Sequence, residues 1–257
     1  MLVLSGWTAS PAGVSAGCTN HHEQSRSVDD YAHAAQLDPT NPQPLYDRGV
    51  AHVSNHQPLL AMDDFDQALK LKPDFTPALM LRGEMRLLER DQPGAKSDFD
   101  AAIAGDPSLR LRVAGAYLSA GAFQPAIDNL DVWIAHAPHN EDLAAPLGNR
   151  CWAKAVLGQD LDKAMGDCNQ ALGLRPGLPR AYDGRALIHL RQGDFDRAIA
   201  DFDAALKLEP HTPLSIYARG LAEQRKGLKD QGDADLAAAV AMAPHIADMA
   251  KRFALTP

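Results

Sequence analysis

The stretch Ala181–Pro210, AYDGRALIHLRQGDFDRAIADFDAALKLEP, has the pattern of two amphipathic helices joined by a turn that contains Gly193. Its apolar residues recur at intervals of three and four, as they do on the buried face of a helix. Small residues stand where the two helices must approach each other, at Ala186, Ala198 and Ala205. Pro210 ends the second helix because its ring cannot continue one. Such a pair buries its apolar face only against neighbours, so the stretch predicts a stack of similar pairs.

A proline closes each such pair along the chain. These prolines are Pro39, Pro73, Pro107, Pro138, Pro176, Pro210 and Pro244, at successive intervals of 34, 34, 31, 38, 34 and 34 residues. When each proline is numbered as position 32 of its unit, positions 8, 20 and 27 hold mostly small residues and position 24 mostly a large one. The pattern predicts full repeats at 42–73, 76–107, 108–138, 141–176, 178–210 and 212–244.

A unit of this period and pattern resembles the tetratricopeptide repeat, a helix–turn–helix motif. The resemblance covers residues 40–244. It implies an all-α, right-handed superhelix of helical hairpins with six full repeats. A partial N-terminal repeat at 27–37 and a C-terminal capping helix at 245–255 complete the predicted array.

Residues 1–27 do not fit the repeat and are predicted to be a leader, followed by the array at 28–257. The leader has a short apolar start and Cys18 behind Ala16 and Gly17, which resembles the end of a secretory signal or a lipoprotein cleavage box. A disordered terminus or a remnant of an earlier repeat is the alternative. Within the array, Trp133 occupies a position that is small in the other repeats, which predicts a bend near 108–140 between blocks at 28–107 and 139–257.

Composition and motifs argue against several classes of function. The net charge is −8 and the isoelectric point about 5.6, so the chain lacks the broad basic surface of a nucleic-acid-binding protein. No apolar run approaches the length of a membrane-spanning helix. The ten histidines are scattered, and the sequence has no phosphate loop, nucleophile elbow or HExxH motif. We expect no enzymatic activity, no metal and no cofactor.

Four repeats have an arginine followed sixteen residues later by an aspartate. Where this arginine is replaced by Val113, the aspartate is replaced by Asn129, so the two positions change together. We expect an ion pair between the two helices of each repeat, in which the guanidinium meets a carboxylate with two hydrogen bonds. The alternative is that these arginines together bind an anionic ligand. The predicted pairs are Arg48 and Asp64, Arg82 and Asp98, Arg185 and Asp201, and Arg219 and Asp235.

The repeat at 141–176 departs from this rule, because Cys151 takes the place of the arginine. Cys151 and Cys168 are predicted to face each other across the helix pair, either as a disulfide or as two buried thiols. A disulfide requires an oxidising compartment. The periplasm or cell envelope is therefore slightly favoured over the cytoplasm, with both left open. Cys18 would then be left over, either lipidated or free.

The resemblance further implies a concave groove lined by the first helix of each repeat, where a peptide or helix of a partner protein would bind. The expected function is a non-enzymatic scaffold for a protein partner. The alternative is a structural protein that assembles into a homo-oligomer through its groove or terminal repeats. The implied groove residues are Tyr46, Val50, Met80, Glu84, Leu87, Asn149, Arg180, Asp183, Leu187, Arg191, Tyr217, Leu221, Gln224 and Arg225.

Overall fold

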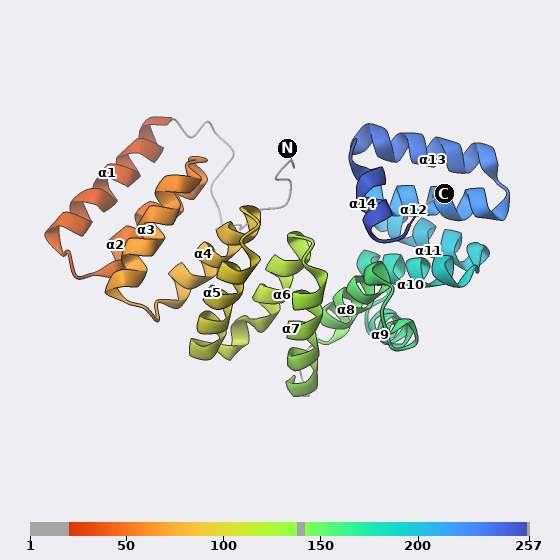
Figure 1. Cartoon of the computed structure of the whole chain (residues 1–257), viewed down its shortest axis with the longest axis horizontal. Helices are drawn as coiled ribbons and strands as arrows, with labels where there is room; N and C mark the ends of the chain where they lie inside the picture. The colour runs from red at the N-terminus through yellow and green to blue at the C-terminus, as the bar shows by residue number, and fades with distance from the viewer. Residues whose placement is uncertain (1–20, 138–141, 256–257) are drawn as a thin grey trace. The chain divides into compact units, whose positions relative to one another are not determined.

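A computed structural model describes residues 21–137 and 142–255, and the side chains from residue 27 onward within them. The described residues form fourteen α-helices and one 3-10 turn, with no strand (Figure 1). The helices are α1 (His21–Leu37), α2 (Pro42–Ser54), α3 (Pro58–Leu71), α4 (Thr76–Leu88), α5 (Gln92–Gly105), α6 (Arg110–Ser119), α7 (Phe123–His136), α8 (Ala144–Leu157), α9 (Leu161–Leu174), α10 (Pro179–Gln192), α11 (Phe195–Leu208), α12 (Pro213–Lys226), α13 (Lys229–Met242) and α14 (Ile246–Arg252).

Local sequence accounts for the ends of these helices. Asn41 and Asp194 each cap a helix, accepting a hydrogen bond from a backbone N–H of the first turn. Proline opens α2, α3, α10 and α12, at a position where no backbone donor is needed. The turns after α8, α10 and α12 use Gly158, Gly193 and Gly227 in the left-handed conformation. The capping residues therefore specify the helix–turn–helix pattern, in addition to the apolar faces of the helices.

The chain divides into two compact units, one ending at Met85 and the other beginning at Arg86, within α4. In the first unit α1 packs on α2, and α2 on α3. The helix predicted at 27–37 begins earlier, at His21, inside the segment predicted to be a leader. The rest of the predicted leader, residues 1–20, lies outside the described residues.

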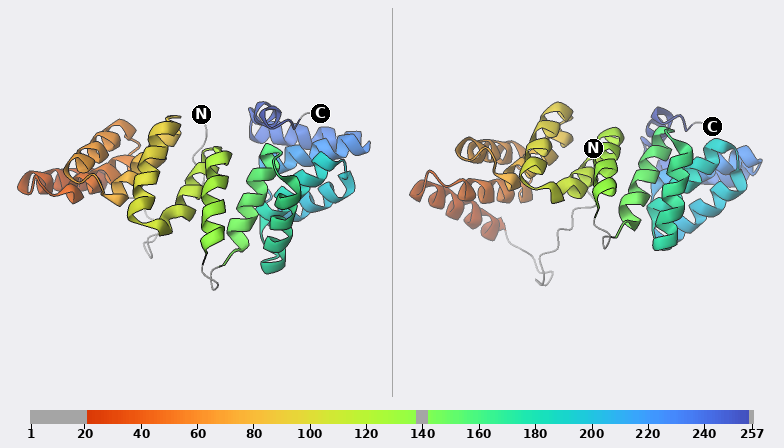
Figure 2. Two further views of the ribbon diagram at one scale, coloured as in Figure 1. Left: turned by 60° about the horizontal axis from the view of Figure 1, so that its bottom comes forward. Right: turned by 90° about the horizontal axis from the view of Figure 1, so that it is seen from below.

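In the second unit, consecutive helices pair as predicted: α6 with α7, α8 with α9, α10 with α11, and α12 with α13. The first helices α8 and α10 also pack against each other, and α10 contacts α9 (Figure 2). Small residues such as Ala164 and Ala198 are fully buried in these contacts, beside large ones such as Phe202. The predicted fold class, an all-α array of helical hairpins, is confirmed.

The irregular third repeat has a structural cause. The chain first makes the 3-10 turn Pro107–Leu109, and α6 then has 10 residues against 14 in α8, α10 and α12. Trp133 is half-buried, whereas the corresponding alanines of the other repeats are buried. The bend predicted near 108–140 stays a prediction. The two compact units meet earlier in the chain, at Met85.

The C-terminal helix α14 packs against α12 and α13, and it buries Ile246 and Ala250 (Figure 1). It therefore covers the last repeat as predicted for a capping helix. In the part of the chain that the structure describes, no helix combines the length and apolar character needed to cross a bilayer.

Candidate functional site

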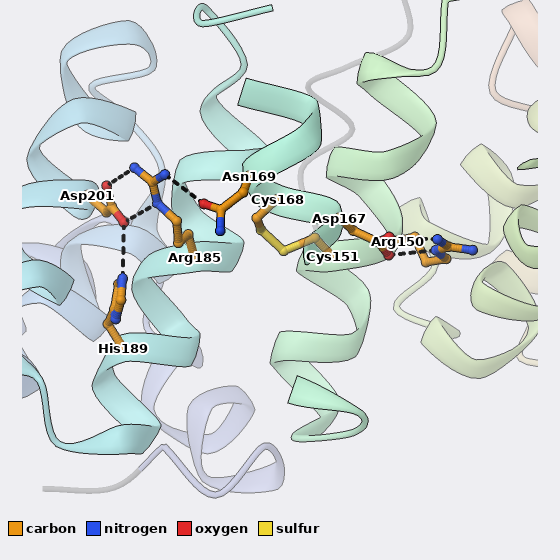
Figure 3. Close-up of a disulfide and its surroundings, with 8 residues drawn as sticks. All are labelled: Arg150, Cys151, Asp167, Cys168, Asn169, Arg185, His189 and Asp201. Carbon is orange, nitrogen blue, oxygen red and sulfur yellow. Dashed lines mark hydrogen bonds and ion pairs between the residues drawn. A yellow bond between two sulfur atoms is a disulfide. The ribbon is translucent and has the colours of Figure 1, made fainter. Parts of the chain in front are cut away.

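Three of the four predicted arginines, Arg48, Arg185 and Arg219, bind a carboxylate on the second helix of their own repeat. Arg185 donates from Nε and Nη2 to the two oxygens of Asp201 at 2.7 and 2.8 Å (Figure 3). Arg219 binds Asp235 in the same way at 2.7 and 3.0 Å. Arg48 donates to both oxygens of Asp64. Hydrogen bonds to these carboxylates raise the pKa of each guanidinium, so the three arginines stay charged.

The same arginines also reach back to the preceding repeat, which the sequence interpretation missed. Arg219 donates from Nη1 to Asp203 at 2.7 Å, and Arg185 from Nη1 to Asn169 at 3.1 Å. Both partners stand seven residues before the proline that closes the preceding repeat. We call these arginines, with Arg82 and Arg150, the arginine row. The recurrence of an acid at that position, also seen at Asp66 and Asp131, was the available signal.

Arg82 and Asp98, which were predicted to pair with each other, each have another partner. Arg82 donates to Asp66 at 2.7 Å, and Asp98 accepts from Arg86 at the same distance. Arg82 and Asp98 belong to different units, so the pair predicted between them stays a prediction.

In the repeat at 141–176 Cys151 stands at the arginine position, and the neighbouring Arg150 makes the equivalent contacts. Arg150 donates from Nε and Nη2 to the two oxygens of Asp167, each at 2.6 Å, and from Nη1 to Asp131 at 2.8 Å. Arg150 stands one position earlier than the other arginines, next to Cys151. A comparison at fixed spacing therefore passed over it.

Cys151 of α8 and Cys168 of α9 are joined in a disulfide (Figure 3). Their Cα atoms lie 5.5 Å apart and both side chains are fully buried. The bridge lies beside the Arg150–Asp167 pair, so one helix pair carries both a covalent and an ionic link. Both links join α8 to α9, and α8 also carries Asn149 and Trp152, which are described below.

The apolar side chains among the predicted groove residues are largely packed inside the protein. Five of them are less than 9% exposed: Met80, Leu87, Leu187, Tyr217 and Leu221. Tyr46 is half-buried between the rings of Phe65 and Phe75, at centroid distances of 6.0 and 5.5 Å, and Val50 is half-buried. A partner would therefore meet mainly the polar members of the predicted groove. Glu84, Asn149, Arg191 and Gln224 are half-buried, and Arg180 and Arg225 are exposed.

In the second unit, predicted groove residues of α8 and α10 lie together around Trp152. Arg180 holds its guanidinium 4.9 Å from the centre of the Trp152 ring, a cation–π contact. It also donates from Nη1 to Oδ1 of Asn149 at 3.3 Å. Trp152 is half-buried, and the Arg180 guanidinium lies over its ring.

Asp183 lies one helical turn after Arg180 and is 8% exposed. Burial raises the pKa of this carboxyl to about 6, against a hydrogen bond from Ser215 that favours the charged form. Nearby Glu209 raises this pKa further, and Arg180 lowers it. Its Oδ1 atom is buried without a hydrogen-bond partner among the described residues. Such a carboxylate costs folding free energy at neutral pH.

Arg191, another predicted groove residue, is committed to backbone carbonyls. It donates from Nε to Ala155 at 2.9 Å and from Nη2 to Val156 at 2.8 Å, where α8 ends and its last carbonyls have no helical partner. Nη2 also donates to the carbonyl of Phe253, 2.6 Å away. Burial lowers the pKa of this guanidinium, as does the nearby charge of Arg225. Arg191 thus ties the chain's C-terminal segment to α8 and α10.

The C-terminal segment, residues 253–255, completes an aromatic row on this side of the unit. The ring of Phe253 meets that of Phe123 edge to face at 5.3 Å, and Phe123 meets Trp152 at 5.2 Å. Leu255 is only 2% exposed. We call the surface formed by Phe123, Trp152, Arg180 and Arg191 the first-helix face, because three of its four residues come from α8 and α10. The sequence predicted a capping helix here but not the return of the chain onto this face.

Two further findings concern possible chemistry elsewhere in the described residues. Within the described ranges, 21–137 and 142–255, no group of three His, Cys, Asp or Glu side chains is placed to hold a metal ion. An open hollow of about 630 Å³ beside α10 is lined by Arg185 together with its two partners, Asp201 and Asn169. The arrangement is suited to contact with another polypeptide through stacking and hydrogen bonds.

Comparison with known proteins places these helices in context. Residues 179–212 match the model of the tetratricopeptide repeat family. No curated protein matches the sequence.

Solved structures have the same fold. A tetratricopeptide repeat protein from Parabacteroides merdae is similar with a TM-score of 0.63 and 16% identity, over 83% of this chain and 86% of that one. PilW, a type IV pilus biogenesis factor, gives 0.61 and 15%, over 79% and 94%. The Cut9–Hcn1 assembly of the APC/C gives 0.62 and 16% over 90% of this chain, but this chain covers only 46% of that one. Residues 179–212 thus match a tetratricopeptide repeat, and the chain as a whole shares the fold of tetratricopeptide repeat structures.

Proposed function

We propose that this chain is a non-enzymatic scaffold that binds a peptide or helix of a partner protein on the first-helix face of its second unit. A tetratricopeptide fold is in itself suited to holding protein partners. The observation that carries the proposal is that this face already accepts a polypeptide segment, residues 253–255, through one guanidinium and one aromatic edge. The contacts used are the stacking and backbone hydrogen bonds that any extended peptide can offer.

Exposed groups extend the face beyond that segment. Arg180 on Trp152, with Asn149 beside it, provides a cation, a ring and an amide on consecutive first helices. Arg and Trp are enriched among the residues that dominate protein interfaces, because each combines a large contact area with directional polar groups. Arg225 adds a second exposed guanidinium at the end of α12.

The test is a selection of random twelve-residue peptides on the immobilised chain, made on the native protein and on Leu255→Glu, in which a charge at a buried site should displace the C-terminal segment. Affinities of the selected peptides are then measured for Arg180→Glu/Arg225→Glu. The matched control is Lys163→Glu/Lys207→Glu, which makes the same change of charge on the exposed sides of α9 and α11. We expect at least tenfold weaker binding to the first variant and unchanged binding to the control.

Equal binding to both charge variants would place the partner site elsewhere, and enrichment of no peptide on either form would refute the scaffold function. Sedimentation of the same samples addresses the alternative predicted from the sequence, self-assembly into a homo-oligomer. A mass that rises with concentration and falls in Arg180→Glu/Arg225→Glu would favour that alternative over a foreign partner.

A further inference from the structure

The C-terminal segment occupies the face that the proposed function assigns to a partner. Two contacts attach it to this face, the Phe253 carbonyl on Arg191 and the Phe253 ring on Phe123, and Leu255 of the same segment is buried. Arg191 and Phe253 are 62 positions apart in the sequence. The segment therefore holds the site as a bound peptide would.

The connection to α14 allows the segment to leave without unfolding the repeat. Ile246 and Ala250, which are buried, anchor α14 itself, and both precede the segment. The helix ends where Leu255 N–H donates to Ala250 at 3.0 Å and Ala254 N–H donates to Lys251 at 3.0 Å. Undocking needs the rearrangement of this one turn.

Ala254 makes the docked turn less favourable than it would otherwise be. Its φ is +54°, a conformation that favours glycine because a Cβ crowds the following carbonyl. The same left-handed position is filled by glycine after α8, α10 and α12. An alanine here weakens the docked state relative to the released state.

We propose that residues 253–255 are an internal ligand that closes the partner site, and that the partner displaces them with a segment of the same chemistry. That chemistry is an aromatic residue followed two positions later by an aliphatic one, with a free backbone carbonyl for Arg191. The inference rests on the proposed function and adds to it both the kind of partner and the way the site is regulated. Because the internal ligand is linked covalently to its site, a partner must compete with its high local concentration.

The probe is a fluorescein-labelled peptide with the sequence of residues 251–257, KRFALTP, and its binding to the chain of residues 1–257 is measured by fluorescence anisotropy. We expect Leu255→Glu to bind this peptide at least tenfold more tightly than the native chain, because the apparent affinity scales with the fraction of open site. Ala254→Gly, which favours the docked turn, should bind it more weakly than the native chain. Phe123→Ala or Arg191→Ala in the Leu255→Glu background should remove the binding, and a KRAALTP peptide should not bind.

Circular dichroism first establishes that each variant keeps the native helix content and cooperative unfolding. Equal affinity of native and Leu255→Glu chains for the probe would overturn the inference, as would no binding by a folded Leu255→Glu chain. If the peptides selected from the random library bind the native and Leu255→Glu chains equally, the partner site exists but is not closed by residues 253–255. If no peptide of any kind binds either form, the proposed function fails as well.

Discussion

Arg185 donates from Nη1 to the amide oxygen of Asn169 at 3.1 Å, whereas Arg219 and Arg150 meet an aspartate at the corresponding position. Arg185 thus has one carboxylate partner, Asp201, where Arg219 and Arg150 each have two. The array carries a neutral link between α9 and α10 where the links on either side are charged.

Asn169→Asp should therefore stabilise the protein by about 0.5 kcal/mol, the usual size of a solvent-exposed ion pair. The measurement is urea unfolding in 20 mM and in 1 M NaCl, since salt screens such a pair and should remove the gain. The same substitution on an Arg185→Gln background is the control. A gain that persists there, or a loss of stability in low salt with Arg185 present, would contradict the interpretation.

Gly184 permits the close packing of α10 on α8. A Cβ at this position would lie 3.0 Å from the backbone N and Cα of Trp152 and 2.8 Å from Sγ of Cys151. Gly184→Ala should destabilise the protein by about 1–3 kcal/mol through overpacking, in spite of the higher helix propensity of alanine.

The control for Gly184→Ala is Gly173→Ala in α9, where a Cβ would meet nothing within 4 Å. That variant should gain up to about 1 kcal/mol from helix propensity. Chemical unfolding of the two variants side by side measures the difference. Equal stability of both would show that α8 and α10 are not in close contact in solution.

Asp183 predicts a dependence of stability on pH. Its pKa is about 6 in the folded protein, above its ordinary value of 3.8. Between these values the folded state binds more protons than the unfolded state, so this group's contribution to stability falls as the pH rises from about 4 to 6. Asp183→Asn should therefore be more stable than the native chain at pH 7.5, by about 1–3 kcal/mol, with the difference vanishing near pH 4.

Thermal unfolding of native and Asp183→Asn chains across pH 4–8 measures this difference directly. Subtracting the two curves cancels the other titrating groups that the chains share. A variant that is less stable than the native chain at neutral pH would mean that the charged Asp183 carboxylate is stabilising, contrary to its buried and unpartnered oxygen.

Reduction of the Cys151–Cys168 bridge should lower the free energy of unfolding by roughly 3 kcal/mol, the value for a loop of this length. Urea unfolding with and without a phosphine reductant measures the change, and Cys18→Ser excludes a contribution from the third cysteine. Before reduction, the unfolded chain should show one reactive thiol, because the protein has three cysteines in all. Three thiols in the untreated protein would show that the bridge had not formed.

The sequence was sufficient to predict what repeats. The interval between prolines and the small residues of each pair recur six times, so helices such as α10 and α11 were predicted close to their observed bounds. The Arg150–Asp167 ion pair was not predicted, because Arg150 is displaced by one residue from the position of the arginine in the other repeats. The return of Phe253 onto Arg191 could not be predicted, since a contact between segments so far apart happens once and leaves no period in the sequence.

The arginine row has a mechanical consequence for the second unit. The guanidinium groups of Arg150, Arg185 and Arg219 each donate two hydrogen bonds to a carboxylate of their own hairpin. Each donates a third to a side chain of the preceding hairpin. Neighbouring hairpins in such arrays otherwise adhere mainly through apolar contacts, which resist separation but little sliding. A directional bond at each of these three junctions opposes sliding and twisting, so the arginine row stiffens this stretch of the array. High salt should weaken the charged links and make the array more flexible, while its helices remain intact.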